Sequence, residues 1–254
     1  MAAMRRTLAA LFVIAILLAP SARADESTVS VGAKQNMTAY LYTPDGPGPY
    51  PGILLLHTSA GLKGADIAYA KQLVSQNYVV LVPAFMAAYG ITGRTRQNTF
   101  TTFADPIYAD FVAALDMMAR QPKVAGRKLG AIGFSNGGYF AMWLAATNKV
   151  AAGVAYYGAF NGAGTDRGLN RFHAAFTETS APVLILHGTG DDTVPLTVAE
   201  NLVSIAKAAG SPYEAQIYKG AWHQFERVGS GSENAAAAAD AWPRTLAFFG
   251  KYLQ

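Results

Sequence analysis

The chain contains no cysteine and only four histidines, and charged residues make up only 14% of its 254 positions. The missing cysteines exclude a disulfide framework, an iron–sulfur cluster and every zinc site built on thiolates. The few scattered histidines argue against a histidine-rich metal cage, and we expect neither a metal nor a cofactor. Hydrophobic residues make up 52% of the chain, which excludes an intrinsically disordered protein.

The net charge of +4 comes largely from the N-terminus. Three arginines and no acidic residue lie in the first 24 residues, so residues 25–254 carry 17 basic and 16 acidic residues, a net charge of +1. This balance gives no basic surface for a phosphate backbone, and we expect no nucleic-acid partner.

Residues 1–24 have the pattern of a cleaved signal peptide. Arg5-Arg6 precede an apolar run from Leu8 to Leu18, Pro20 ends the run, and Ala22-Arg23-Ala24 places small residues at a cleavage position. Because a bilayer core of about 30 Å needs a longer apolar segment, a membrane anchor is the weaker interpretation. We therefore expect a mature chain that begins at Asp25, is exported to the periplasm or secreted, and has no membrane attachment.

From residue 27 onward, short β-rich runs alternate with segments of helical period. Residues 29–32 and 38–42 predict a hairpin, and further strands are predicted at 52–57, 78–82, 129–134, 150–156, 183–187 and 213–218. Helices are predicted at 65–76, 106–121, 137–146, 195–209 (with Pro195 as its first residue) and 232–253 (kinked or restarted at Pro243). The alternation predicts an α/β fold with a mostly parallel sheet and helices on both faces. We expect residues 25–254 to form one domain and 158–181 to be a long functional loop.

The strongest chemical motif is Gly133-Phe134-Ser135-Asn136-Gly137, between a predicted strand and a predicted helix. Such a turn exposes the serine Oγ on a strained backbone, and the glycines let strand and helix approach each other closely. The bare pattern also arises by coincidence, but the flanking elements favour a nucleophile elbow. We therefore predict that Ser135 is the nucleophile.

A serine hydroxyl is a weak nucleophile, so it needs a base, and the base needs an orienting acid. Asp191 and Asp192 follow the strand 183–187, and His223 follows the strand 213–218 as the only later histidine. This order of nucleophile, acid and base is typical of a nucleophile elbow fold. The Asp-x-x-Val-Pro spacing favours Asp191 as the acid and leaves Asp192 as a turn residue. The alternative for His223 is a histidine of a surface loop.

An oxyanion hole needs two N–H donors beside the nucleophile. We expect one from the backbone of Asn136 and the other from the loop after strand 52–57. In that loop Ser59 is the preferred donor and Thr58 the alternative. His57 precedes the loop and is expected to pack at the strand end rather than to act as a base.

Three motifs together resemble the dienelactone hydrolase family of α/β-hydrolases: Phe134-Ser-Asn-Gly-Gly138, His187-Gly-x-x-Asp191-x-x-Val-Pro195 and Gly220-x-x-His223-x-Phe225. The resemblance covers nearly all of residues 25–254 and implies an α/β-hydrolase fold that cleaves ester or lactone bonds. Family members that hydrolyse dienelactone have a cysteine where this chain has Ser135 and a glutamate where it has Thr58. Both differences indicate a serine esterase, and they argue against dienelactone itself as the substrate.

The resemblance also implies that Arg227 binds a carboxylate of the substrate, and a solvated loop arginine is the alternative. Arg94 and Arg96 lie in a polar loop and are weaker candidates for the same anion. Side chains near the strand ends are candidates for pocket walls, although such side chains more often belong to the core. They are Phe85, Met86, Tyr157, Trp222 and Phe225.

These observations predict an exported hydrolase that cleaves a small-molecule ester through Ser135, His223 and Asp191. A peptidase or an acyltransferase with the same triad is an alternative. A non-catalytic binding protein on the same fold is another, although it would have no need for a complete triad. The sequence predicts neither the acyl group of the substrate nor an oligomeric state.

Overall fold

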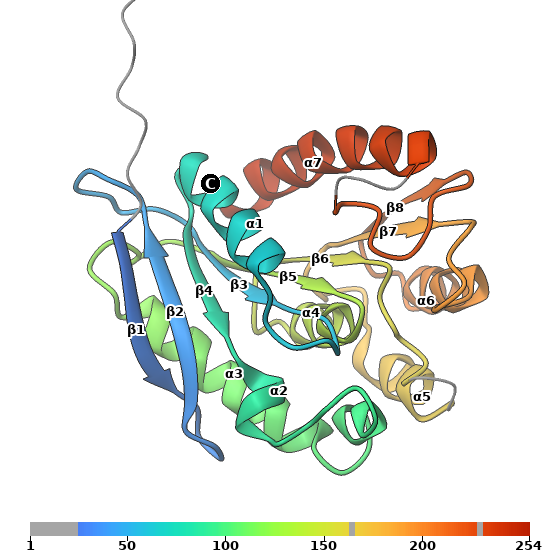
Figure 1. Cartoon of the computed structure of the whole chain (residues 1–254), viewed down its shortest axis with the longest axis horizontal. Coiled ribbons are helices and arrows are strands. Elements are labelled where there is room, and N and C mark those ends of the chain that lie inside the picture. The colour runs from blue at the N-terminus through green and yellow to red at the C-terminus, as the bar shows by residue number, and fades with distance from the viewer. Residues whose placement is uncertain (1–24, 163–165, 228–230) are drawn as a thin grey trace, which may run out of the picture.

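The computed structural model describes residues 25–162, 166–227 and 231–254, and the predicted signal peptide lies outside these ranges. An eight-stranded sheet runs through the molecule with helices on both of its faces (Figure 1). The predicted α/β-hydrolase fold with a mostly parallel sheet is therefore confirmed. None of the helices in the described ranges is long and apolar enough to cross a membrane.

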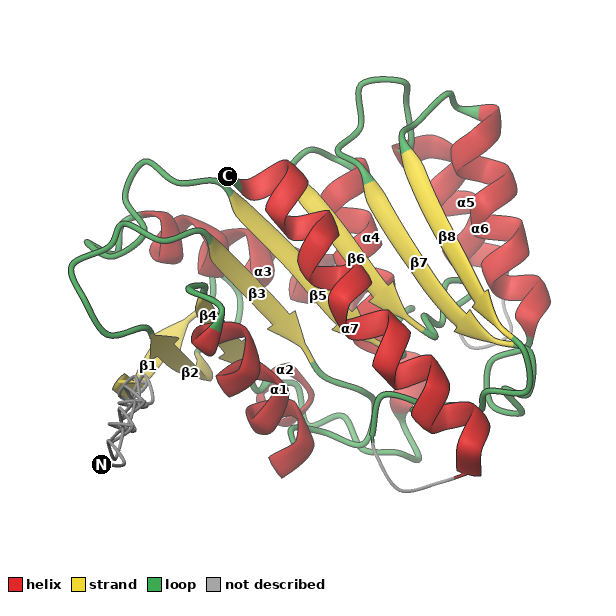
Figure 2. Ribbon diagram, turned by 90° about the horizontal axis from the view of Figure 1, so that it is seen from above, coloured by secondary structure: helices red, strands yellow, loops and turns green. Residues whose placement is uncertain are grey.

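The strands follow the order β1-β2-β4-β3-β5-β6-β7-β8 across the sheet. The β1·β2 and β2·β4 pairs are antiparallel, whereas every pair from β4 to β8 is parallel. The carboxyl ends of the parallel strands therefore meet at one edge of the sheet, where open α/β sheets bind ligands (Figure 2). The strands are β1 (Asp25–Val31), β2 (Met37–Thr43), β3 (Gly52–Leu56), β4 (Val79–Pro83), β5 (Leu129–Phe134), β6 (Ala152–Tyr156), β7 (Val183–Gly188) and β8 (Tyr213–Tyr218).

Two helices, α1 and α7, cover one face of the sheet, and helices α3, α4 and α6 cover the other (Figure 2). The helices are α1 (Gly64–Ser75), α2 (Phe85–Ala88), α3 (Ala104–Ala119), α4 (Asn136–Ala146), α5 (Asp166–Ala175), α6 (Leu196–Ala208) and α7 (Gly231–Leu253), with a 3-10 turn η1 (Arg96–Thr99).

Strand β3 shows how the sheet divides the core. Leu54 and Leu56 pack into the cluster beneath α3 and α4, whereas Ile53 and Leu55 pack into the cluster beneath α1 and α7. All four side chains are fully buried. The period of two in a continuous apolar run is what a strand covered on both faces requires.

The structure corrects or narrows three details of the predicted elements. The segment 158–181 is not a continuous loop, because it contains α5, which Phe172 and the following Phe176 anchor in the core. Of the two alternatives for Pro243, a kink or a restart of the helix, the restart is excluded, because α7 is continuous and buried alanines before Pro243 and Phe248 and Phe249 after it pack against the sheet. Pro195 precedes the first residue of α6 as its N-cap.

Candidate active site

Ser135 lies on a sharp turn between β5 and α4. Its backbone angles, φ 52° and ψ −113°, are strained for a residue with a side chain. A Cβ atom at Gly133 would lie 2.1 Å from the carbonyl oxygen of Gly137, and one at Gly137 would lie 2.0 Å from that of Leu56. The two glycines therefore permit the close approach of strands β3 and β5 to α4 that this turn requires.

His223 bridges the serine and an aspartate. Its Nε2 atom is 3.2 Å from Oγ of Ser135, and its Nδ1 atom is 2.7 Å from Oδ2 of Asp191. An ionised carboxylate only accepts hydrogen bonds, so Nδ1 carries the proton and Nε2 is left to accept the proton of the serine hydroxyl. This tautomer is the one that general-base catalysis at Ser135 needs.

Asp191 rather than Asp192 faces the histidine. Its Oδ1 atom accepts the backbone N–H groups of Thr193 at 2.9 Å and of Val194 at 2.8 Å. Burial alone would raise the pKa of Asp191, but the hydrogen bonds from His223 and from the backbone outweigh burial and hold the pKa below its ordinary value. Asp192 is exposed and accepts a hydrogen bond from the side chain of Thr193.

A cavity of about 380 Å³ opens above the serine and the histidine. Asn136, the first residue of α4, lines it together with Thr58 and Ser59 from the loop after β3. The fold therefore brings the residues expected to form the oxyanion hole to the same cavity as the nucleophile. Both Ser59 and Thr58 lie there, so the placement alone does not choose between them.

The rest of this cavity has mixed walls, in which Ala60, Ala159, Val194 and Pro195 are the apolar residues. Arg96 comes from η1, and in the part of the chain that the structure describes it has no ion-pair partner and a single long hydrogen bond, 3.5 Å, to the Gly93 carbonyl. Arg94 does not line the cavity. Four further polar wall residues carry no signal of their own in the sequence: Gln97 of η1, Asn161 after β6, Thr193 in the acid turn and Gln224 beside the base.

The aromatic residues expected as pocket walls lie elsewhere. Tyr157, Phe225 and Phe85 are fully buried, in line with the alternative that they belong to the core. Trp222 is 57% exposed and lies beside Gly190, where a Cβ atom would be 2.7 Å from its Cδ1 atom. Neither Tyr157 nor Trp222 lines the cavity that contains Ser135, because Tyr157 points into the core behind His223 and Trp222 toward solvent.

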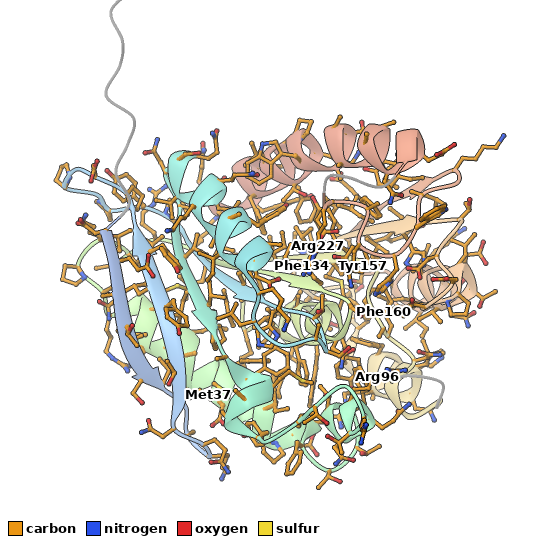
Figure 3. The ribbon with its side chains drawn as sticks, viewed as in Figure 1. Met37, Arg96, Phe134, Tyr157, Phe160 and Arg227 are labelled. Atoms are coloured by element: carbon orange, nitrogen blue, oxygen red, sulfur yellow. The ribbon has the colours of Figure 1, made fainter. Side chains whose placement is uncertain are left out.

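Arg227 also lies outside the catalytic cavity. Its Nη2 atom donates to Asp66 at 3.1 Å, and its Nε atom donates to Glu226 at 3.2 Å. It lines a second cavity of about 480 Å³ between α1 and α7, with Phe134 in the same wall (Figure 3). The guanidinium is thus already paired with two carboxylates, and the side chain is 22% exposed.

Two further histidines support the site from the core. His57 is fully buried and stacks on Phe85 with ring centroids 4.2 Å apart, as expected for a residue that packs at a strand end. Burial lowers the pKa of His57 to about 4, so it is neutral at pH 7. His187 is buried as well, and its Nε2 atom lies 2.9 Å from the carbonyl oxygen of Val194 in the turn of Asp191. Within the described ranges no group of acidic or histidine side chains is suited to hold a metal ion.

Comparisons with known proteins agree with this architecture. The model of the dienelactone hydrolase family matches residues 37–253. A relative from Methylorubrum extorquens named "Putative carboxymethylenebutenolidase" is 27% identical over 223 residues, which cover 84% of this chain and 76% of the relative.

Solved structures share the fold. A "Putative Dienelactone Hydrolase" from Klebsiella pneumoniae matches with a TM-score of 0.70 at 24% identity. The match covers 91% of this chain and 100% of the Klebsiella chain. An acylaminoacyl peptidase from Pyrococcus horikoshii has a TM-score of 0.72 at 16% identity over 91% of this chain and 42% of the peptidase. Since the family model spans most of the chain, the protein belongs to the dienelactone hydrolase family and is a carboxylic ester hydrolase.

Proposed function

We propose that the protein hydrolyses ester bonds through an acyl-enzyme on Ser135. His223 takes the proton of the serine hydroxyl as Oγ attacks the carbonyl carbon, and it then gives this proton to the leaving alcohol. Asp191 holds the imidazole in the required tautomer and stabilises the imidazolium. Water then attacks the acyl-enzyme with the same proton transfers and releases the acid.

The observation that carries this proposal is the continuous series of contacts from Asp191 through His223 to Ser135. The two distances of 2.7 Å and 3.2 Å lie within hydrogen-bond range before any substrate is bound. The strained backbone of Ser135 adds support, because strain of this kind persists where the surrounding structure enforces it for function.

We further propose that the backbone N–H groups of Asn136 and Ser59 stabilise the oxyanion. Asn136 lies at the N-terminus of α4, where the helix dipole favours negative charge. Donors held in place before the reaction need no reorganisation as the charge develops. No step of this mechanism requires a metal or a cofactor.

The substrate class follows from the cavity and from the relatives. A cavity of about 380 Å³ with both polar and apolar walls suits a small ester better than a long acyl chain. The name of the Methylorubrum relative refers to a butenolide, which is a lactone, so we include lactones among the substrates. The serine nucleophile and Thr58 still argue against dienelactone itself.

Labelling with a fluorophosphonate probe tests the proposal. The wild-type chain should be labelled on Ser135, whereas Ser135→Ala and His223→Ala should lose both labelling and hydrolysis of p-nitrophenyl esters. The double variant should be little worse than either single variant, because the two residues act as one unit. An unreactive Ser135 in the folded wild-type protein would favour a non-catalytic binding protein.

A peptidase with the same triad is the second candidate, since the fold is shared with an acylaminoacyl peptidase. Comparing p-nitrophenyl esters with the matched p-nitroanilides separates the two activities. We expect esters of short acyl chains to be cleaved and anilides to be resistant. An acyltransferase would instead release less free acid when an acceptor alcohol is added.

We propose that the protein acts after export. The support is the charge and apolar pattern of residues 1–24, which lie outside the described part of the chain. N-terminal sequencing of the protein from the exported fraction should begin Asp25-Glu-Ser. Intact Met1 in that fraction would contradict cleavage.

A further inference from the structure

A buried polar cluster lies directly behind the catalytic histidine. We call Asp66, Tyr157, Glu226 and Arg227 the Arg227 cluster. Asp66 is in the first turn of α1, Tyr157 follows β6, and Glu226 and Arg227 are three and four residues after His223. Figure 3 shows Arg227 and Tyr157 close together in the centre of the molecule. The cluster thus joins three separate elements at the back of the site.

Arg227 holds the two carboxylates of the cluster together. It donates to Asp66 at 3.1 Å and to Oε1 of Glu226 at 3.2 Å, and Tyr157 donates to the same Oε1 atom at 2.5 Å. The side chains of Asp66 and Glu226 are 1% and 8% exposed. Burial raises the pKa of both carboxyl groups. Without the guanidinium, two acidic groups would face each other in an environment with little water.

The cluster reaches the catalytic base through Tyr157. The Tyr157 ring lies against the His223 ring, with centroids 4.5 Å apart and planes inclined by 58°. Tyr157 has a φ of 40°, a left-handed conformation that is uncommon for an aromatic residue. Its hydroxyl is fixed by Glu226 and its N–H by the carbonyl oxygen of Leu186 at 2.7 Å. A conformation of this kind persists only when its surroundings enforce it.

The cluster also fixes the conformation of the loop that carries His223. Gln224 has a φ of 64°, and the N–H of Arg227 donates to the carbonyl oxygen of Gln224 at 3.0 Å. The side chain of Arg227 then ties this turn to α1 through Asp66. His223 is therefore held from behind by Tyr157 and from its own loop by Arg227.

We propose that Arg227 is a positioning residue that holds His223 in line with Ser135, and that it is not an anchor for a substrate carboxylate. This inference rests on the proposed role of His223 as the base. Its support is that Arg227 lies outside the catalytic cavity and already binds two carboxylates of its own chain. A small displacement of a catalytic group lowers the rate of the reaction strongly, whereas it leaves the binding of a neutral ester intact.

The test compares Arg227→Met with Arg244→Met on a neutral p-nitrophenyl ester. Arg244 is the matched control, because it also pairs with a carboxylate, Asp240 at 3.0 Å, but on the exposed surface of α7. Arg227→Met should lower kcat about 100-fold with little change in KM, and Arg244→Met should change neither. In Arg227→Met, kcat for a carboxylate-bearing ester should fall by the same factor as kcat for the neutral ester.

Two further variants test the proposal if Arg227→Met alone does not fold. Tyr157→Phe removes only the hydroxyl that Glu226 fixes, and we expect kcat to fall about tenfold. Glu226→Gln combined with Arg227→Met removes one negative and one positive charge together, and this double variant should also lose kcat. Circular dichroism and thermal unfolding identify the variants that fold.

A further comparison tests whether the cluster acts through the base. Arg227→Met should not lower the residual activity of His223→Ala, since there is no imidazole left to position. The downfield NMR resonance of the Nδ1 proton shared with Asp191 should shift or broaden in Arg227→Met. Folded Arg227→Met and Tyr157→Phe variants with wild-type kcat on both esters would overturn the proposal, as would a loss confined to the carboxylate ester. Full activity of Ser135→Ala and His223→Ala would instead refute the serine mechanism itself.

Discussion

Val194 fixes the carboxylate of Asp191 from one side: its backbone N–H donates to Oδ1 of Asp191 at 2.8 Å. The carbonyl oxygen of the same Val194 lies 2.9 Å from Nε2 of the buried His187. The turn that carries the acid is therefore held by the core, and Oδ2 of Asp191 is left for His223. This arrangement explains why the Asp-x-x-Val-Pro spacing identifies the acid.

Asp191→Asn should lower kcat for ester hydrolysis by about 10⁴-fold while the fold stays intact. An amide at this position donates to Nδ1 and so leaves the proton on Nε2, where it prevents that atom from accepting the serine proton. Asp192→Asn is the matched control and should change turnover little, since Asp192 is exposed and its carboxylate accepts a hydrogen bond from the side chain of Thr193. Steady-state kinetics of both variants test the assignment of Asp191 as the acid. A larger loss of kcat in Asp192→Asn than in Asp191→Asn would assign the acid to Asp192 instead.

The elbow depends on two glycines, and a matched glycine elsewhere provides the control. Gly133→Ala should destabilise the protein by several kcal/mol or prevent folding, because the added Cβ would lie 2.1 Å from a backbone oxygen that has no room to move. Gly250→Ala in α7 has open space around it and should raise the free energy of unfolding by about 0.5–1 kcal/mol. Urea unfolding of both variants measures the difference. Equal stabilities would show that the elbow is not tightly packed.

Local rules made the triad predictable from the sequence. The elbow and the acid turn each follow a buried strand with a continuous apolar run, whereas the base loop follows β8, a partly exposed edge strand, and is identified by the order of His223 after the acid. Ser135, Asp191 and His223 come together because parallel strands end at one edge of the sheet. The alternation of strand and helix also predicted a mostly parallel sheet with helices on both faces, but it did not predict the strand order, in which β3 lies between β4 and β5.

The walls of the cavity were not predictable in the same way. Gln97, Asn161 and Gln224 come from η1, from the segment after β6 and from the base loop, which are far apart in the sequence and share no periodic pattern. Helix α5 was missed although Leu169, Phe172 and Phe176 recur with helical period and pack against the core, because the surrounding segment is rich in Gly, Asn and Thr. Tyr157 was expected in the pocket because it follows a strand end, but its left-handed backbone turns it into the core.

Arg96 should select for substrates that carry a negative charge. It is the cationic side chain in the wall of the catalytic cavity, and no carboxylate in the described ranges pairs with it. Arg96→Ala should lower kcat/KM for a carboxylate-bearing ester about tenfold and leave the neutral ester of the same size nearly unchanged. The measurement is the ratio between the fold-loss in kcat/KM for the carboxylate-bearing ester and the fold-loss for the neutral ester. A ratio near one would mean that Arg96 does not contact the substrate.

The stability of the fold should fall between pH 6.5 and pH 4. His57 is buried as the neutral imidazole with a pKa of about 4, whereas the unfolded chain takes up a proton at this residue below about pH 6.5. The contribution of His57 is therefore complete above pH 6.5 and is lost progressively as the pH falls toward 4. At pH 5 the free energy of unfolding should be about 2 kcal/mol lower than at pH 7 from this residue alone. Urea unfolding at both pH values should show a smaller difference in His57→Gln, and an unchanged difference would exclude His57 as the source.

Trapping the acyl-enzyme tests the central claim most directly. The protein is quenched in acid during turnover of a slowly hydrolysed p-nitrophenyl ester, digested and analysed by mass spectrometry. The mass of the acyl group should appear on the peptide that contains Ser135 in the wild-type protein, and it should be absent in His223→Ala. Turnover with no adduct at Ser135, or with the acyl group on another residue, would contradict the account.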